Sequence, residues 1–245
     1  MNWGRLSAAN HRGDLVPRVL GIALALCATL STVAYAIVRD ADAAAWGSLA
    51  GILLVFAAGL IDDLAPVGPR GLRNHLRELA SGRMTTGILK LIVTAGVSVV
   101  VVALQPERAG YARAAAVVLV AASANVWNGL DVRPGRALKA FVLVSIAFAV
   151  WGALGNVPAM AGLAAGAIVA LPFDLAEWAM LGDGGANALG FAAGLAIADV
   201  LPDPWVPVAA AAAVALNVVA DTVTFSRVIE VTPPLRWADA LGRRP

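Results

Sequence analysis

The sequence predicts an all-α integral membrane protein, a bundle of about eight transmembrane helices with both termini in the cytoplasm. Hydrophobic residues make up 60% of the 245 residues and charged residues only 14%, whereas roughly 25% of a soluble domain is charged. The mean hydropathy is +0.80. Backbone in lipid must form helices or closed barrels, and the apolar runs lack the two-residue alternation of a barrel strand.

Eight apolar segments can each supply one spanning helix, because a span needs about 20 predominantly apolar residues. Ala and Gly are abundant in them, and small residues let helices approach closely in lipid. Arg5, Arg12 and Arg18 lie before or at the start of the first segment, but its length and the lack of a cleavage site favour an anchor over a signal peptide. In chain order the segments are Leu15–Val38, Ala43–Ile61, Thr85–Leu104, Ala112–Trp127, Ala137–Leu154, Pro158–Phe173, Ala186–Val200 and Val206–Phe225.

The distribution of Lys and Arg predicts the orientation of these segments. With the N-terminus inside, 15 of the 18 Lys and Arg residues fall on the inner side, and only Arg39, Arg108 and Arg113 fall outside. Cytoplasmic loops carry such an excess of positive charge. We therefore expect one membrane domain over residues 1–245, with inner segments at 62–84, 128–136 and 174–185 and an inner tail at 226–245.

The first inner segment begins with two adjacent carboxylates, Asp62 and Asp63, at the end of an apolar helix. Acids at the membrane boundary are costly unless they are hydrated, paired or metal-bound, so they indicate function more often than a plain solvated helix end. Further on, Leu72, Leu76 and Leu79 share a helical face with arginines beside it, which predicts a short helix on the membrane surface. Lys90 follows, one turn into a span, where it either snorkels to the interface or pairs with an anion.

The second inner segment follows Asn125 and Asn128, which lie three apart on one helix face, with Asp131 continuing the series. Two amides and a carboxylate can bind a metal, or a base and ribose, and amides also serve as simple contacts between helices. The third inner segment has a Gly-rich turn, Gly182-Asp183-Gly184-Gly185, before a helix. Backbone amides there favour phosphate, and Asp183 either binds a divalent cation or caps the helix.

Taken together, the three inner segments favour magnesium-dependent phosphate chemistry. Mg²⁺ usually takes one or two carboxylates and shares the phosphates of a substrate. The acids, the glycines and the nearby cations are all expected on the same side of the membrane. The nearby cations include Arg133, Arg136 and Lys139.

These motifs resemble those of the polyprenyl-phosphate N-acetylhexosamine-1-phosphate transferases, which include phospho-N-acetylmuramoyl-pentapeptide transferase. The family has an Asp-Asp pair, an Asn-x-x-Asn-x-x-Asp stretch and a Gly-Asp-x-Gly loop in that order on cytoplasmic loops. Here they are Asp62-Asp63, the stretch Asn125 to Asp131, and Gly182 to Gly185. The resemblance covers roughly residues 53 to 190 and implies transfer of a phosphosugar from a UDP-activated amino sugar to a polyprenyl phosphate, with release of UMP.

The resemblance also implies roles for single residues. Asp183, together with Asp62, would bind Mg²⁺, while Asp62 or Asp63 would contact the metal or act as a base toward the lipid phosphate. Lys90 would neutralise phosphate charge, and Asp131 would hold nucleotide or metal. The expected catalytic set is thus Asp62, Asp63, Lys90, Asp131 and Asp183, and the expected substrate-binding set is Asn125, Asn128, Arg133, Arg136, Lys139 and Gly185.

The chain departs from the family at several points. It is shorter than members with about ten spans, its only histidines are His11 and His75, so a His-rich loop is absent, Val132 replaces a common Gly, and Ala186 replaces a usual Ser. The expected setting is a bacterial plasma membrane and cell-wall glycan synthesis, with a homodimer suggested by relatives and no nucleic-acid partner. Cys27 is the only cysteine, which excludes an internal disulfide or a cysteine zinc site.

Two other interpretations remain open from the sequence. A non-catalytic relative would bind lipid-linked precursors or scaffold an envelope complex, although costly acids are rarely kept without use. An ion-coupled transporter would use Asp221 and Glu177 as relays, but transporter sites lie near the bilayer midplane, whereas the acids here cluster at the inner face.

Overall fold

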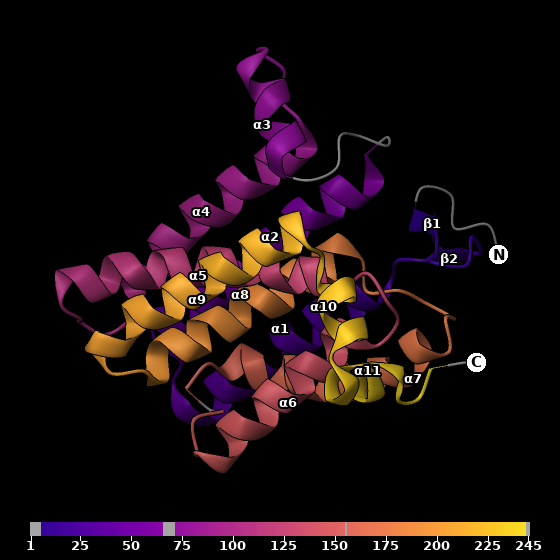
Figure 1. Cartoon of the computed structure of the whole chain (residues 1–245). Helices are drawn as coiled ribbons and strands as arrows, with labels where there is room; N and C mark the ends of the chain where they lie inside the picture. Colours follow the sequence, from indigo (N-terminus) through magenta and orange to yellow (C-terminus); the bar gives the residue numbers. More distant parts are fainter. Residues whose placement is uncertain (1–5, 66–71, 155, 244–245) are drawn as a thin grey trace.

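The computed structural model describes residues 6–65, 72–154 and 156–243, and it is an all-α bundle with one small hairpin (Figure 1). Within helix α3, the side chains of residues 72, 73, 75 and 76 lie outside the description. The elements are β1 Ser7–Ala9, β2 Leu15–Pro17, α1 Leu20–Arg39, α2 Ala43–Leu64, α3 Leu72–Ala80, α4 Thr86–Leu104, α5 Gly110–Leu130, α6 Arg136–Val150, α7 Pro158–Leu175, α8 Gly182–Val200, the 3₁₀ helix η2 Asp203–Trp205, α9 Val206–Thr222, α10 Phe225–Val231 and α11 Pro233–Ala240.

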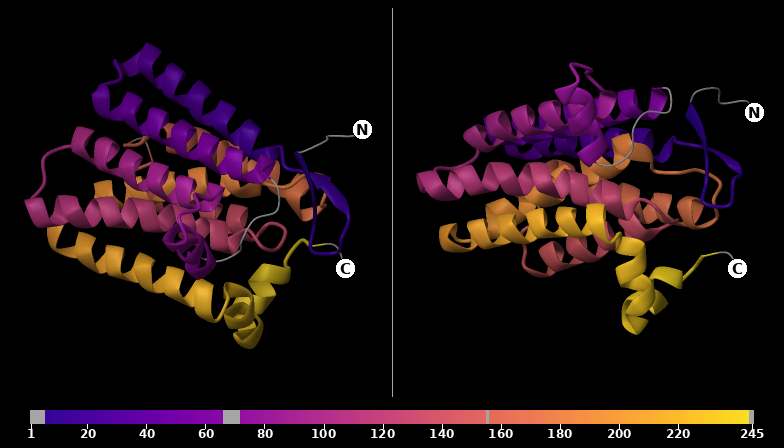
Figure 2. Two further views of the ribbon diagram at one scale, coloured as in Figure 1. Left: turned by 90° about the horizontal axis from the view of Figure 1, so that it is seen from above. Right: turned by 45° about the horizontal axis from the view of Figure 1, so that its top comes forward.

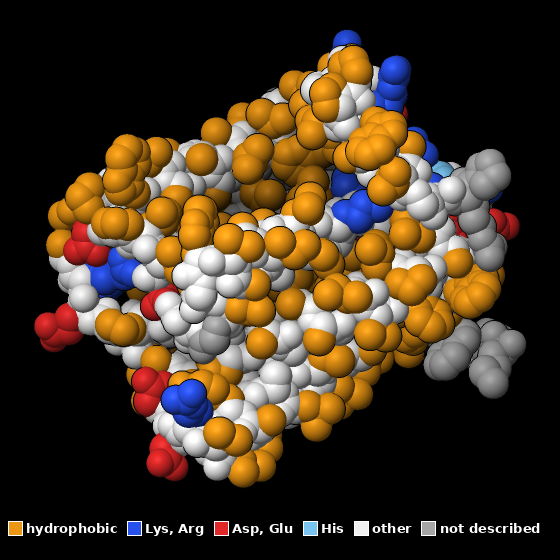
Figure 3. Space-filling view, turned by 90° about the horizontal axis from the view of Figure 1, so that it is seen from below, with side chains coloured by type: hydrophobic (Ala, Val, Ile, Leu, Met, Phe, Trp, Pro, Cys, Tyr) orange, Lys and Arg blue, Asp and Glu red, His pale blue; other side chains and the backbone are white. Residues whose placement is uncertain are grey.

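Each of the eight predicted apolar segments forms a helix, and six of these are long and apolar enough to cross a membrane. The six are α1, α2, α4, α5, α7 and α9 with the preceding η2. Helix α6 has only 15 residues, and α8 carries Asp183, Asn187 and Asp199 within its 19 residues. The flank in Figure 3 is covered largely by hydrophobic side chains, as expected of helices that face lipid.

Several boundaries differ from the predicted ones. The first apolar run does not begin as a helix, because Leu15–Pro17 pairs antiparallel with Ser7–Ala9 and α1 starts only at Leu20. Helices also extend into the segments expected as loops. Asp62 and Asp63 lie in the last turn of α2, and Asn128 lies in the last turn of α5. The acids are therefore held by regular backbone, not by flexible turns.

Helix α8 occupies the middle of the bundle and is buried along nearly its whole length. It packs against α5, α2 and α1, and the close approaches involve glycines. A Cβ built on Gly59 of α2 would lie 2.6 Å from the Cα of Gly184. Gly21 of α1 likewise lies directly against Gly185. Glycine in these places lets three helix backbones meet around the first turn of α8, which carries Asp183.

The N-terminal hairpin and the C-terminal helices α10 and α11 lie at the same end of the bundle in Figures 1 and 2. The predicted surface helix exists as α3, which projects beside the start of α4 (Figure 1). The expected apolar face of Leu72 and Leu76 lies outside the described side chains.

Candidate active site

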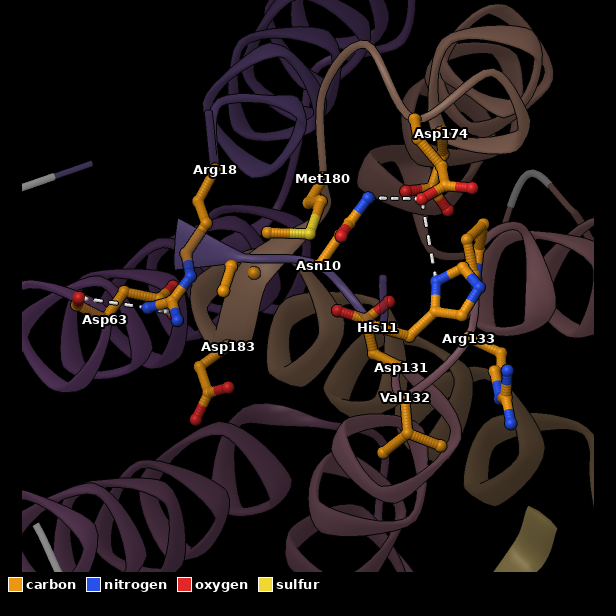
Figure 4. Close-up of a pocket in the computed structure, with 14 residues that line it drawn as sticks. Asn10, His11, Arg18, Asp63, Asp131, Val132, Arg133, Asp174, Met180 and Asp183 are labelled. Carbon is orange, nitrogen blue, oxygen red and sulfur yellow. Dashed lines mark hydrogen bonds and ion pairs between the residues drawn. The ribbon is translucent and has the colours of Figure 1, made fainter. Parts of the chain in front are cut away.

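The three motif segments meet at the end of the bundle that carries the hairpin. Asp63 comes from the last turn of α2, Asp131 is the residue that ends α5, and Asp183 lies in the first turn of α8. All three line one polar cavity of about 420 Å³ (Figure 4), here called the polar cavity. Asp63 and Asp183, 120 positions apart in the sequence, are thus brought together.

Lys90 joins two of the predicted carboxylates. Its Nζ donates to Asp62 Oδ2 at 2.8 Å and to Asp183 Oδ2 at 2.5 Å, and the residue is only 7% exposed. The hydroxyl of Thr86 donates to the other oxygen of Asp62. Lys90 therefore pairs with anions inside the protein instead of snorkelling to the interface, and Asp62 and Asp183 lie side by side across its ammonium group.

Asp63, unlike its neighbour Asp62, is held by Arg18. Arg18 Nη1 donates to Asp63 Oδ1 at 2.9 Å and to the Asp63 carbonyl at 3.0 Å. The backbone N–H of Gly184 donates to Asp63 Oδ2 at 3.1 Å. These bonds fix the end of α2 against the start of α8. In the sequence Arg18 is only one of the positive charges on the inner side of the membrane, and no spacing signal links it to Asp63.

Asp131 adds a carboxyl group to the acidic lining of the polar cavity. Among the described residues no Lys or Arg forms an ion pair with it. Burial, followed by the charges of Asp174, Asp183 and Asp63, raises the pKa of Asp131 well above its usual range. Asp131 therefore resists ionisation in the polar cavity as it stands, and a bound cation would relieve the repulsion and favour its charged form.

The predicted amides divide between two places. Asn187 Nδ2 donates to Asn128 Oδ1 at 3.3 Å and to the Asp183 carbonyl at 2.6 Å, which ties the end of α5 to the first turns of α8. Asn125 instead donates to Asn217 of α9 at 2.5 Å, and both Asn125 and Asn128 line a second hollow, not the polar cavity. Gly185 packs against Gly21 and so serves helix packing.

A second hollow, here called the membrane groove, leads away from Lys90. One cavity of about 410 Å³ lies between α4, α5 and α9, and another of about 410 Å³ continues beside it. Both are lined by Lys90, Leu91, Asn125 and Asn217, and the second is otherwise mostly apolar along α4 and α5. Lys90 thus faces the groove while its ammonium group contacts Asp183, which lines the polar cavity.

Two of the expected substrate-binding cations are used elsewhere. Arg136 is buried and binds both carboxylate oxygens of Asp239 in α11, at 2.8 and 3.0 Å. Lys139 donates to the carbonyls of Ala238 and Asp239. Burial opposes ionisation of Asp239, yet hydrogen bonds and charge from Arg136, with Arg243, hold its pKa below the usual value. Arg136 and Lys139 therefore anchor the tail, a role the sequence analysis did not foresee, and only Arg133 of the three lines the polar cavity.

The N-terminal hairpin also reaches the polar cavity, through Asn10 and His11. The carboxylate of Glu177, in the connection between α7 and α8, accepts from Asn10 and pairs with Arg12 at 3.1 Å. Sequence reasoning missed this contact. A signal was present in Asn10, Gly13 and Asp14, since such residues mark a tight turn, and Gly13 has φ +92°.

Comparison of the chain with protein-family models, curated proteins and solved structures finds no match. The functional assignment therefore depends on the arrangement of its own residues.

The carboxylates of Asp62, Asp131 and Asp183 are the oxygen donors that the site could offer to Mg²⁺. In residues 6–65, 72–154 and 156–243, no three His, Cys, Asp or Glu side chains form a ready metal cage. Mg²⁺ does not require one, because it commonly uses one or two carboxylates and the phosphates of a substrate. Asp131 and Asp183 supply hard oxygen donors in one acidic cavity, whereas the oxygens of Asp62 are used by Lys90 and Thr86. The residues fit a magnesium ion held jointly with a phosphorylated ligand.

Proposed function

We propose that this chain is a Mg²⁺-dependent phosphoglycosyl transferase of a bacterial plasma membrane. It would move a phosphosugar from a UDP-activated amino sugar to a polyprenyl phosphate at the cytoplasmic face and release UMP. The observation that carries the proposal is the shared contact of Asp62 and Asp183 with Lys90, at the junction of a polar cavity and an apolar groove. The proposal includes eight spans, with α6 and α8 crossing the membrane beside the six long apolar helices.

The membrane groove suits the acceptor lipid. A polyprenyl phosphate has a long apolar tail and an anionic head, and the groove offers apolar walls that begin at Lys90. In this proposal the tail lies along α4 and α5 while the head reaches Lys90. An ammonium group at low exposure stabilises phosphate charge more strongly than it would in water.

The polar cavity suits the nucleotide sugar. An oxygen of the acceptor phosphate would form a bond to the phosphorus that bears the sugar. The bond from that phosphorus to the bridging oxygen would break, and its electron pair would leave on UMP. Lys90 would stabilise the charge that develops on the phosphates. Asp183 and Asp131 would hold Mg²⁺, which supplies Lewis-acid stabilisation of the diphosphate. Asp62 orients Lys90, and Asp63 positions the start of α8.

The test is turnover by the purified full-length chain in lipid vesicles. The vesicles contain polyprenyl phosphate, and the donors are UDP-N-acetylglucosamine and a panel of other UDP-amino sugars. We expect Mg²⁺-dependent release of UMP, loss of release with EDTA, and a new lipid whose mass equals the acceptor plus a phosphosugar. Failure to release UMP from every donor would overturn the proposal, and magnesium-independent lipid binding without turnover would favour a non-catalytic relative.

A further inference from the structure

Three consecutive residues of the N-terminal hairpin gather around one buried carboxylate. Asn10, His11 and Arg12 all contact Glu177, with His11 Nδ1 lying 3.6 Å from Glu177 Oε2. The Glu177 side chain is only 9% exposed, and its backbone is left-handed at φ +56°. Non-glycine residues seldom adopt that conformation, and they keep it where surrounding contacts hold it. Glu177 thus fixes the turn of the hairpin in one place.

A second set of contacts fixes the base of the hairpin. The N–H of Met180 donates to the Pro17 carbonyl at 2.8 Å, and the N–H of Leu20 donates to the Met180 carbonyl at 3.2 Å. Within the turn, Asn10 Oδ1 accepts from the backbone N–H groups of Arg12 and Asp14. The hairpin is therefore attached at both ends to the connection between α7 and α8, and it forms a fixed wall of the polar cavity.

His11 faces the polar cavity from this wall, and Arg133 lines it from the connection after α5 (Figure 4). In the close-up, His11 and Arg133 lie toward one side and Asp63 and Asp183 toward the other. With Nδ1 turned to Glu177, Nε2 is the ring nitrogen of His11 that remains for a ligand. In the imidazole tautomer whose proton is on Nδ1, Nε2 is an acceptor.

The position of the two hollows determines which part of a donor would meet His11. In phosphoryl transfer the attacking and leaving oxygens lie roughly in line. If the acceptor phosphate comes from the membrane groove at Lys90, the leaving UMP must extend to the opposite side, into the polar cavity. The uridine then lies beyond Asp183, toward Arg133 and His11.

We propose that the hairpin is the uracil-recognition wall of the donor site, with His11 as the contact residue and Glu177 as its positioning residue. This inference rests on the proposed function. The edge of uracil presents an N3–H donor between two carbonyl acceptors. His11 Nε2 accepts from N3–H, and Arg133 donates to a neighbouring carbonyl. The hairpin thereby supplies selectivity for a uridine nucleotide from a segment with no assigned role in the sequence motifs.

The test measures binding of UMP and of N3-methyl-UMP to the full-length chain in nanodiscs with Mg²⁺. The variants are His11→Ala, His11→Gln and Glu177→Gln, with Leu15→Ala as the matched control, because Leu15 is 78% exposed in the same hairpin and lines no part of the cavity. We expect His11→Ala to weaken UMP binding about tenfold, as for a lost hydrogen bond with a buried partner. His11→Gln and Glu177→Gln should lose less, and Leu15→Ala should bind as the wild type does.

The methylated nucleotide separates recognition from general damage. N3-methylation should weaken binding to the wild type but add nothing in His11→Ala, and KM for the UDP-sugar should rise in that variant while KM for polyprenyl phosphate stays constant. Equal UMP binding by the wild type and His11→Ala, in a chain that turns over UDP-sugars, would overturn this inference alone. A wild type that neither binds UMP nor releases it would overturn the proposed function and this inference together.

Discussion

At the scale of single residues, the charge balance around Lys90 is the central feature of the site. One ammonium group lies between the carboxylates of Asp62 and Asp183 inside a segment long and apolar enough to span a membrane. Two acids and one base leave a net negative charge, and a bound cation would favour ionisation of Asp131 in the adjoining polar cavity. Charges in such places are expensive, so their number favours a site completed by a bound cation.

Replacing Asp183 with Asn should abolish most of the activity. The change keeps the size of the side chain but removes the charge that pairs with Lys90 and the oxygen donor offered to Mg²⁺. We expect UMP release to fall about 100-fold or more, as when one preorganised electrostatic group is lost. The measurement is the initial rate of UMP release at saturating Mg²⁺.

The matched control for this change is Asp199→Asn. Asp199 lies on the same helix, α8, near its other end, where it accepts from Asn156 at 2.7 Å. It lines none of the three hollows, so the rate should stay close to that of the wild type. Full activity in Asp183→Asn would remove Asp183 from the site.

Single residues also show what the sequence could and could not predict. Asp62, Asp131 and Asp183 were predictable because each ends or begins an apolar run, where an acid is unusual. The partners of other acids were not predictable. Arg18 binds Asp63, which lies 45 positions later in the sequence. Arg12 binds Glu177, which lies far along the chain in the connection between α7 and α8. A polar residue in a short segment near a terminus is not part of a periodic pattern that would identify its partner. Only the folded structure therefore shows which residue it contacts.

At the scale of elements, the site depends on how closely α2 and α8 approach. Gly59 meets Gly184 with no side chain between the two backbones. The same crossing places the Gly184 N–H on Asp63 and Asp183 near Lys90. Any group inserted at this crossing would separate the two helices and with them the acids of the site.

Gly59→Ala should therefore lower both stability and turnover. The added Cβ would lie 2.6 Å from the Cα of Gly184, too close for either backbone to accept without moving. We expect a loss of roughly 1–3 kcal/mol, typical of overpacking, and a larger proportional loss of UMP release. The measurements are the thermal midpoint in detergent and the rate of UMP release.

Gly96→Ala is the matched control in helix α4. A Cβ built there meets no atom within 4 Å. Alanine is favoured over glycine inside a helix by about 1 kcal/mol, so this variant should be at least as stable as the wild type and fully active. An equally stable and active Gly59→Ala would show that the crossing does not govern the site.

The elements also differ in how far they could be predicted. The eight bundle helices follow from apolar composition, and every one of the eight predicted segments contains one of them. The strands Ser7–Ala9 and Leu15–Pro17 and the helices α10 and α11 were not predicted. Their positions depend on contacts with distant residues and not on an apolar pattern of their own. In α11, for example, Asp239 accepts a hydrogen bond from Arg136. Short elements of this kind are stabilised by tertiary contacts more than by propensity.

At the scale of the whole molecule, the hairpin, the polar cavity and the last helices lie at one end of the bundle (Figures 1 and 2). An even number of crossings, whether eight or six, would return the chain to the side from which it started, in agreement with this arrangement. The count depends on α6 and α8, which fall short of the length or hydropathy of a typical span. If α6 did not cross, Trp151 would lie on the same side as the polar cavity.

Cysteine labelling in intact cells can test this topology. A Cys27→Ala background, followed by single cysteines, makes each position report its side through a membrane-impermeant maleimide. With eight crossings and the N-terminus inside, label should reach cysteines at the outer connections, whereas the inner ones should react only after the cells are opened. The outer positions are Arg39, Glu107, Trp151 and Trp205, and the inner positions are Arg83 and Arg236; all six are exposed.

Trp151 gives the decisive reading, because it lies between α6 and α7 and is 74% exposed. Label at Arg39, Glu107 and Trp205 but not at Trp151 would mean that α6 and α7 do not form a crossing pair, and the count would fall to six.

The polar cavity contains residues from the connection after α5 and from the connection after α7. Both connections must face the same side for the acids to meet, and α6 is too short to span an undistorted bilayer of about 30 Å hydrocarbon at 1.5 Å per residue. Labelling of Trp151 would therefore also indicate that the bilayer thins or the helix is extended by its neighbouring turns at this edge of the bundle.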